Sequence, residues 1–368
     1  MEKAFEKFVI HRFRGLRDIE LSNLGRINLL VGPNNSGKTS VLEAISAYCR
    51  PMDPLEWLST AWRREIKSSR IPMMDALKWL FPQAAGGDLE YLYKGKVRLS
   101  ATGTFQIFEV SADYREISGI EDVGESDSEI GSIDGDIIRR GAELTLKAGA
   151  DNPLLGFEQL SQNFQIWENE RFVKRRTSKE YTLPVTTITP FSHRVEPLQV
   201  KLFTDAAFQQ VTDYVMYIAK QLDSDINGIQ ILDKTGMRSG VYIEHAKTGL
   251  SPISVFGDGL RRTLTIALNL PLVRDGILLI DEIETSIHTS ALKTVFQWLA
   301  NSCEKLNVQL FATTHSIEAI DAILSVDKEI KKDLAAYRLP SPETDGKVKR
   351  FGDDLLYRLR HERGMDVR

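Results

Sequence analysis

Residues 27–39, with the sequence INLLVGPNNSGKT, decide the fold of this chain. Residues 27–31 predict a short buried strand, and residues 32–39 match the spacing GxxxxGK[ST] in full. Apolar residues at helical spacing continue through residues 40–45, which completes the strand, loop and helix that this motif requires. Glycines let backbone N–H groups approach an anion closely, and the following helix points its positive end at the same anion. The stretch therefore predicts a phosphate-binding loop.

Each residue of this loop has a predicted role in binding ATP together with Mg²⁺. Lys38 is expected to bridge the β- and γ-phosphates, and Thr39 to present its hydroxyl to Mg²⁺. An ordinary turn would also use Gly32 and Gly37, but it would not require the flanking strand and helix. The residues predicted to bind the nucleotide are Gly32, Pro33, Asn34, Asn35, Ser36, Gly37, Lys38, Thr39 and Ser40.

A second apolar segment, in the distal half, ends in two adjacent carboxylates. Residues 276–280 (GILLI) predict a buried strand, and Asp281 and Glu282 follow it directly. In this Walker B pattern the aspartate organises Mg²⁺, and the glutamate orients the attacking water and removes its proton. Asp281 is therefore a predicted metal residue together with Thr39, and Glu282 is the predicted catalytic base. Glu284 is a reserve acid two residues further along.

A third apolar segment ends in a histidine. Residues 308–314 predict another buried strand, and His315 follows it. The carboxyl ends of the strands in parallel α/β sheets form the rim where ligands bind, so His315 is a candidate contact for a γ-phosphate. A lone histidine in this place more often has a structural role, but the two other motifs favour a functional one. His315 thus joins Lys38 and Glu282 as a predicted catalytic residue.

Together these segments resemble the ABC-type ATPases, in the branch that contains RecF, the SMC heads and the overcoming-lysogenization-defect (OLD) family. The resemblance implies an α/β fold: an ABC-type P-loop ATPase head with a mixed sheet, a β-rich N-terminal lobe and an α/β insertion. Besides the phosphate loop, the matching segments are residues 8–18 as the opening strand, 256–262 as the signature loop, 281–284 as Walker B, 286–288 as the D-loop and 313–316 as the H-loop.

The resemblance also implies a homodimer or a higher homo-oligomer. In a head-to-tail dimer each ATP lies between the phosphate loop of one subunit and the signature loop of the other, so Gly257 and Gly259 are predicted to bind the nucleotide. Signature loops close to LSGGQ have a serine where this chain has Gly257, and here Asp258 stands in the middle of the loop. This chain therefore lacks the serine hydroxyl. The backbone N–H groups of Gly257 and Gly259 and the dipole of the helix starting near Leu260 are expected to hold the phosphate instead. The rate of hydrolysis and the position of a Q-loop glutamine stay open.

Composition narrows the class of protein. The chain has 368 residues, and 47 Lys and Arg against 51 Asp and Glu give a net charge of -4, so contact with DNA would need a local basic patch. Two cysteines, Cys49 and Cys303, are too few for a disulfide framework or a zinc site. Residues 1–7 have no apolar core followed by a small-residue cleavage site, and no apolar run reaches the roughly 18 residues that span a bilayer, so we expect neither a leader peptide nor a membrane span. We expect a cytoplasmic protein without a membrane partner.

The ATPase core is expected to be split along the chain. Residues 1–50 and 251–368 are assigned to the core, and residues 51–250 to completion of the β-lobe and to a helical and β insertion for dimerisation or partner binding. That insertion shows no sustained heptads, so a coiled-coil arm is not expected. Within it we expect one amphipathic helix over residues 199–222, an acidic surface loop over 121–136, and a basic cluster over 171–179 that forms a charged hairpin or contacts DNA or a partner.

The segment after His315 guides the functional hypothesis. It is too short for the Toprim nuclease domain that follows the ATPase in OLD nucleases, so a controlled nuclease or toxin would be a separate chain. The leading hypothesis is an ATP-binding and ATP-hydrolysing switch that dimerises around ATP and regulates a separately encoded effector, in bacterial antiviral defence. The alternative is a RecF-like DNA repair ATPase that binds DNA, and a transporter head is the weakest interpretation.

Overall fold

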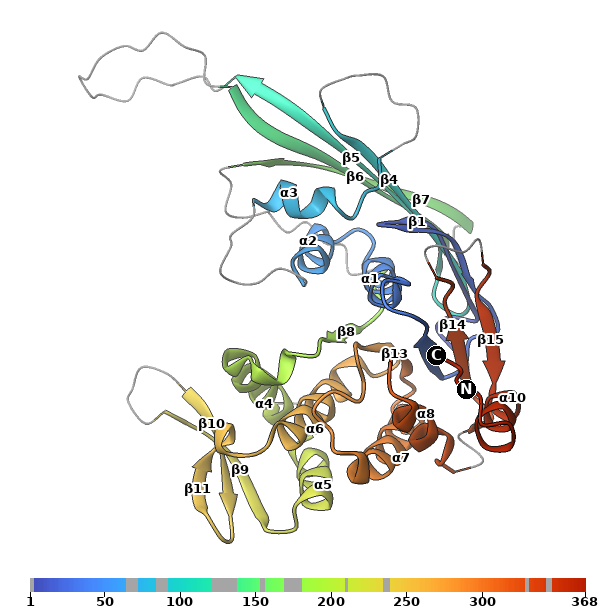
Figure 1. The fold of residues 1–368 in the computed structure, drawn as a ribbon. Coiled ribbons are helices and arrows are strands. Elements are labelled where there is room, and N and C mark those ends of the chain that lie inside the picture. The colour runs from blue at the N-terminus through green and yellow to red at the C-terminus, as the bar shows by residue number, and fades with distance from the viewer. Residues whose placement is uncertain are drawn as a thin grey trace, which may run out of the picture. The chain divides into compact units, whose positions relative to one another are not determined.

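The chain forms two compact units, each described separately below (Figure 1). The first contains Met1–Lys7, Leu21–Leu42 and Leu183–Arg368, and the second contains Phe8–Glu20 and Glu43–Thr182. A computed structural model describes residues 3–63, 72–83, 92–120, 138–152, 156–168, 181–208, 211–233, 239–327, 331–341 and 346–368. The acidic segment 121–136 and the basic cluster 171–179 lie outside these residues. The predicted α/β fold with mixed sheets is confirmed.

The first unit is built on a six-stranded sheet of order β15-β14-β3-β13-β12-β8. Neighbouring strands are parallel except β15, which is antiparallel to β14. β3, β12 and β13 are buried along their whole length, as expected for parallel strands covered on both faces. The strands are β3 (Ile27–Val31), β8 (Val185–Ile188), β12 (Ile277–Ile280), β13 (Gln309–Thr313), β14 (Leu334–Arg338) and β15 (Lys349–Gly352). Because the parallel strands share one direction, their carboxyl ends meet at one edge.

Helices and a small antiparallel sheet complete the first unit. The sheet has the order β11-β10-β9, and α4 packs against both β10 and α6. The sheet strands are β9 (Ile226–Asp233), β10 (Ser239–His245) and β11 (Gly249–Pro252), and the helices are α4 (Glu196–Phe208), α5 (Thr212–Leu222), α6 (Asp258–Asn269), α7 (Thr289–Lys305), α8 (Ile317–Leu324) and α10 (Asp353–Tyr357). Three 3₁₀ turns lie at Ser192–Arg194, Ile253–Val255 and Pro271–Val273, and a π-helical turn lies at Arg358–Glu362. Among the described residues, no helix combines the length and apolar character needed to span a membrane.

The prediction of one helix over residues 199–222 is wrong. The structure has two helices there, because α4 ends at Phe208 and α5 begins at Thr212. The backbone N–H of Val211 donates to the carbonyl oxygen of Ala206, five residues earlier, at 3.0 Å. A bond of this span is typical of the end of a helix, so α4 and α5 are separate helices.

The second unit has a six-stranded sheet of order β2-β1-β4-β5-β6-β7. β4 alternates exposed and buried residues, the pattern of an antiparallel strand with one face on a core. In that core Trp57 stacks on Phe81, and Phe81 stacks on Tyr114. The elements are β1 (Lys7–Phe13), β2 (Leu16–Leu21), β4 (Lys94–Thr102), β5 (Ile107–Ile120), β6 (Ile138–Asn152), β7 (Gly156–Trp167), α2 (Pro54–Trp62) and α3 (Met73–Lys78), and the boundary between units falls inside α1 (Lys38–Cys49).

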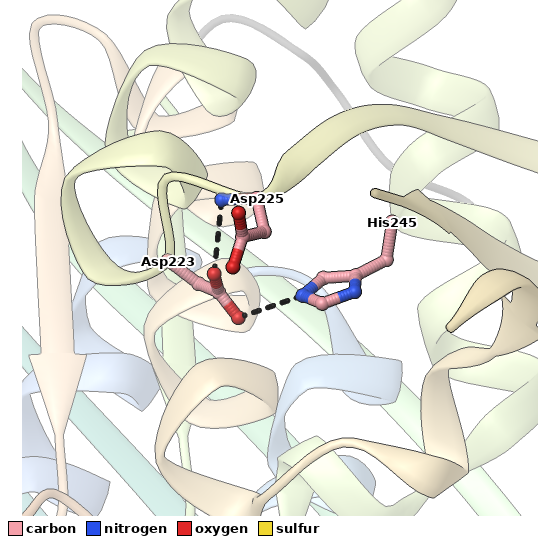
Figure 2. A group of neighbouring side chains, drawn as sticks. All are labelled: Asp223, Asp225 and His245. Carbon is pink, nitrogen blue, oxygen red and sulfur yellow. Dashed lines mark hydrogen bonds and ion pairs between the residues drawn. The ribbon is translucent and has the colours of Figure 1, made fainter. Parts of the chain in front are cut away.

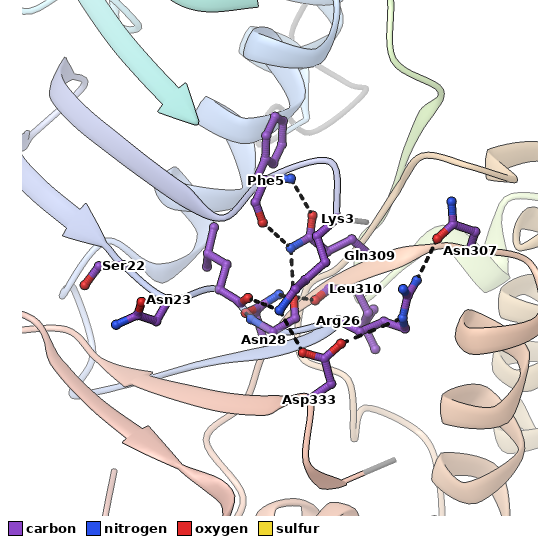
Figure 3. Close-up of polar contacts among 12 residues, drawn as sticks. Lys3, Phe5, Ser22, Asn23, Arg26, Asn28, Asn307, Gln309, Leu310 and Asp333 are labelled. Carbon is purple, nitrogen blue, oxygen red and sulfur yellow. Dashed lines mark hydrogen bonds and ion pairs between the residues drawn. The ribbon is translucent and has the colours of Figure 1, made fainter. Parts of the chain in front are cut away.

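A buried amide network ties the start of the chain to the main sheet (Figure 3). The side chain of Gln309 accepts from the N–H of Phe5 at 3.0 Å and donates to the carbonyl oxygens of Phe5 and Gly25, at 2.8 and 2.9 Å. Asn28 accepts from the N–H of Gly25 at 2.8 Å and donates to the carbonyl of Leu310 at 3.2 Å. These two side chains hydrogen-bond buried backbone groups of Phe5, Gly25 and Leu310.

We expect Gln309→Leu to reduce the free energy of unfolding by about 2 kcal/mol, because the N–H and the carbonyl oxygen of Phe5 and the carbonyl oxygen of Gly25 each lose a buried hydrogen bond to the Gln309 amide. Urea denaturation of the purified chain measures this loss. Gln230→Leu, at an exposed position of β9, is the matched control and should change the free energy of unfolding by about 0.5 kcal/mol or less. Equal effects of the two substitutions would contradict the role given to Gln309.

Candidate nucleotide-binding site

The phosphate loop lies between β3 and α1, at the carboxyl edge of the main sheet. Gly32, Asn35 and Gly37 have φ angles of 143°, 62° and 87°, in the region that favours glycine. A Cβ added to Gly32 would come within 3.0 Å of the carbonyl oxygen of Leu339. The loop is therefore a tight backbone cradle in which a side chain at its first position would occupy the space beside β14.

Lys38 is folded back into this cradle. Its ammonium donates to the carbonyl oxygens of Gly32 at 2.9 Å and Pro33 at 2.8 Å, and the residue is 6% exposed. Burial lowers the pKa of Lys38, and the nearby carboxylates of Asp281, Glu282 and Glu284 oppose that effect. An entering phosphate would replace the two neutral carbonyl oxygens as the partner of the Lys38 ammonium. Because an anion binds the ammonium more strongly than a neutral carbonyl oxygen does, this exchange favours phosphate binding.

Asp281 brings the ends of three structural elements together. Its carboxylate accepts from the hydroxyl of Thr39, at the start of α1, at 3.2 and 3.1 Å. It also accepts from the hydroxyl of Thr313, at the end of β13, at 2.6 Å. Hydroxyl and carboxylate oxygens are the donors that Mg²⁺ prefers, so Thr39 and Asp281 fit the predicted metal. The sequence assigns Thr313 to the end of a strand and to the H-loop, but it does not predict the contact to Asp281, which depends on the pairing of β12 with β13.

Glu282 occupies a strained backbone position directly after Asp281. Its φ angle is 49°, which is uncommon for a residue other than glycine, asparagine or aspartate. The hydroxyl of Thr313 accepts from the N–H of Glu282 at 2.8 Å, and the hydroxyl of Thr285 donates to its carboxylate at 3.0 Å. These two contacts fix the backbone and the carboxylate of Glu282 directly after Asp281, and strain of this kind is common at functional sites.

The backbone of His315 is held on both sides. Its N–H donates to Oε1 of Glu284 at 2.9 Å, and its carbonyl oxygen accepts from Nη1 of Arg368 at 2.8 Å. Oε2 of Glu284 is buried, without a hydrogen-bond partner among the described residues. The structure therefore places His315 at the same edge of the sheet as Lys38 and Asp281. The contact of His315 with Glu284 is made by its backbone N–H.

Arg262 connects α6 to the Walker B turn, a role that the sequence does not reveal. The residue is 0% exposed, and its guanidinium donates to the carbonyl oxygens of Asp281 at 2.9 Å, Glu282 at 3.4 Å and Thr189. Burial lowers its pKa to about 10, although Asp281, Glu282 and Glu284 act in the opposite direction. A buried cation that bonds three carbonyls fixes the backbone of both acidic residues.

The predicted signature residues lie where α6 begins. Gly257 is the N-cap residue of α6, and Gly259 is in its first turn. A Cβ added to Gly259 would come within 2.9 Å of the carbonyl oxygen of Ser286, so the signature stretch touches the predicted D-loop. The first turn of a helix has N–H groups without intrahelical partners, which suits an anion.

Asp223, Asp225 and His245 form a second polar cluster (Figure 2). Nδ1 of His245 accepts from the backbone N–H groups of Lys247 and Thr248, both at 3.2 Å. Nε2 therefore carries the ring proton and donates to Asp223 at 3.2 Å. Asp225 pairs with the ammonium of Lys247. Since each group has a protein partner, we assign this cluster to fixing the turn after β10 against the start of β9.

Several known proteins are similar to parts of this chain. A protein of Methanocaldococcus jannaschii named "Uncharacterized protein MJECL11" is 44% identical over 68 residues, which are 18% of this chain and 60% of the relative. An "ATP/GTP phosphatase" of Helicobacter pylori is 21% identical over 340 residues, covering 89% of this chain and 88% of the relative. The M. jannaschii protein MJECL10 matches over 43 residues, so the chain spans 60% and 20% of the length of the two archaeal relatives.

Solved structures of SMC heads are similar over nearly the whole chain at low sequence identity. An SMC head bound to the C-terminal winged-helix domain of ScpA is 12% identical with a TM-score of 0.49, covering 98% of this chain and 99% of that one. The SMC head domain of Thermotoga maritima is also 12% identical, with a TM-score of 0.41, covering 95% and 98%.

A family model matches residues 113–321, more than half of the chain. The matched region contains Asp281, Glu282 and His315, and it begins after the phosphate loop. The chain therefore belongs to the family described as AAA domain, putative AbiEii toxin, Type IV TA system.

Proposed function

We propose that this chain binds ATP with Mg²⁺ and hydrolyses it at the edge of the main sheet. One observation carries the proposal: the hydroxyl of Thr39 and the carboxylate of Asp281, 242 positions apart in the sequence, lie 3.1 Å apart. Their contact joins the two motifs that a P-loop ATPase needs on the same phosphate and metal. The name of the H. pylori relative, ATP/GTP phosphatase, agrees with this activity.

Each side chain then has a defined task. Lys38 and the N–H groups of the loop would hold the β- and γ-phosphates, and Thr39 and Asp281 would hold Mg²⁺, which when bound would neutralise charge that develops on the phosphates. Glu282 accepts the proton of the attacking water, and His315 contacts the γ-phosphate. Glu284 positions the His315 backbone, as its 2.9 Å contact to the His315 N–H indicates.

Removal of the lysine ammonium tests nucleotide binding directly. We expect Lys38→Ala to weaken binding of Mg-ATP by about 100-fold, because a buried cation that faces the phosphates is lost. Titration with a fluorescent ATP analogue gives the dissociation constant. Lys293→Ala, in α7 and away from the loop in sequence, is the control and should bind as the parent does. Unchanged affinity of Lys38→Ala would refute the assigned site.

We further propose that ATP acts as a switch between two copies of the chain. Each ATP would lie between the phosphate loop of one copy and Gly257 and Gly259 of the other. Stabilisation of triphosphate charge then needs donors from both copies, so hydrolysis and phosphate release weaken the interface. The position of both glycines at the start of α6 supports this arrangement.

The switch is proposed to control a separately encoded nuclease or toxin in antiviral defence, as in an OLD-like branch. The family description, which names a toxin and a toxin–antitoxin system, supports this context. We would purify tagged Glu282→Gln in Mg-ATP from a host carrying the neighbouring genes, with Lys38→Ala as the matched control. A stoichiometric protein bound only to Glu282→Gln is the expected result. DNA in place of such a protein would reject the effector role and favour the RecF-like alternative.

A further inference from the structure

Asp258, the residue that stands in the middle of the signature stretch, is surrounded by cationic side chains. Oδ2 of Asp258 accepts from Nη2 and Nε of Arg194 at 2.5 and 3.1 Å. Oδ1 accepts from Nη1 of Arg261 at 3.1 Å and lies 3.7 Å from Nε2 of His193. One carboxylate thus occupies a site lined by two guanidinium groups and an imidazole.

His193 is the buried member of this site. The residue is 1% exposed, and neither ring nitrogen has a hydrogen-bond partner in the part of the chain that is described. The pKa of His193 is lowered, mainly by burial and next by the charge of Arg262. Arg194 and Arg261 lower it further, whereas Asp258 raises it. The charges that face the imidazole are therefore three cations and one anion, and the site has an excess of positive charge.

The site is open to a ligand from solution. The side chains of Asp258 and Arg194 are 31% and 57% exposed, whereas Arg261 is 14% exposed. The site also lies at the N-terminal end of α6, a helix of 12 residues whose dipole favours a negative charge there. A phosphate has more negative charge and more acceptor oxygens than a carboxylate, and guanidinium groups bind it through paired hydrogen bonds.

We propose that Arg194, Arg261 and His193 form an anion site, which Asp258 fills in the isolated chain and which the terminal phosphate of ATP bound by a second copy takes over. This inference rests on the proposed ATP switch and assigns new residues to it. The guanidinium groups replace the serine hydroxyl that the signature stretch lacks. Asp258 is an internal competitor, which keeps two copies apart until a nucleotide triphosphate is present.

A purely structural clamp between Asp258 and the arginines predicts a different result. If the clamp only shapes the start of α6, loss of either partner impairs association of two copies in the same direction. If Asp258 competes with the phosphate, its neutralisation strengthens association, while loss of Arg194 or Arg261 weakens it. The sign of the Asp258→Asn effect therefore separates the two explanations.

The test measures association of the full chain in Mg-ATP by sedimentation, in the Glu282→Gln background that preserves ATP. We expect Arg194→Ala and Arg261→Ala to weaken association about tenfold or more, and Asp258→Asn to strengthen it by a similar factor. At a protein concentration too low for two copies to associate, each variant should bind a fluorescent ATP analogue at its own phosphate loop as the parent does. Weaker association of Asp258→Asn would overturn the proposal, and equal association in inorganic phosphate alone would assign the site to free phosphate instead.

Two controls protect this result. Arg274→Ala removes an exposed arginine of the same unit and should associate as the parent does. A mixture of Lys38→Ala and Arg194→Ala should associate more strongly than either variant alone. The Arg194→Ala copy supplies an intact phosphate loop and the Lys38→Ala copy an intact anion site, so the mixed dimer has one complete site. Failure of the mixture would overturn the contact between copies. If the parent itself does not bind ATP, the proposed function fails at the phosphate loop, a result distinct from failure of this site alone.

Discussion

Glu282→Gln is expected to lower the turnover of ATP by about 100-fold or more, with ATP affinity close to that of the parent. The amide preserves the shape of the side chain and its contact with the hydroxyl of Thr285, but it cannot accept a proton from water. Asp281, Thr39 and Lys38 are untouched, so binding is retained. Phosphate release in steady state and equilibrium binding of an ATP analogue measure the two quantities separately.

Glu284→Gln is the matched control for that experiment. Glu284 accepts a hydrogen bond from the backbone of His315, so its amide should lower turnover much less than the amide at position 282 does. The opposite order, with Glu282→Gln as active as the parent and Glu284→Gln inactive, would show that Glu284 is the base.

Arg262→Met is expected to reduce the free energy of unfolding by about 4 kcal/mol, because three buried carbonyl groups lose a charged donor. Methionine approximates the length of the aliphatic part of the side chain, so the loss reports mainly on the hydrogen bonds. Urea denaturation measures it, and Arg274→Met, at an exposed position, is the control. Equal stability of the two variants would contradict the role of Arg262 in fixing Asp281 and Glu282.

The sequence predicts the parts of the site whose chemistry is local. The phosphate loop is recognisable because glycine spacing, lysine and flanking periodicity all lie within residues 27–45. Asp281, Glu282 and His315 are recognisable because each follows an apolar strand, and strand ends in a parallel sheet share one edge. The structure places the phosphate loop, Asp281, Glu282 and His315 in the first unit, with Thr39 and Asp281 in contact.

The sequence does not predict contacts that depend on strand order or on packing between distant segments. β8 is short and its four residues carry little pattern, yet it borders β12 and positions Thr189 and Arg194. Arg262 is part of the predicted signature stretch, but only the folded chain shows that its charge is buried against three carbonyl groups. The contact of Asp258 with Arg194 is not predicted for the same reason, because Arg194 is 64 positions away in the sequence.

We propose that ATP, and not ADP, joins two copies of this chain. The molar mass of Glu282→Gln by light scattering, in Mg-ATP and in Mg-ADP at the same protein concentration, measures this association. We expect twice the mass of one chain in Mg-ATP and a lower mass in Mg-ADP. Equal masses in the two nucleotides, with ATP binding demonstrated in the same sample, would contradict it.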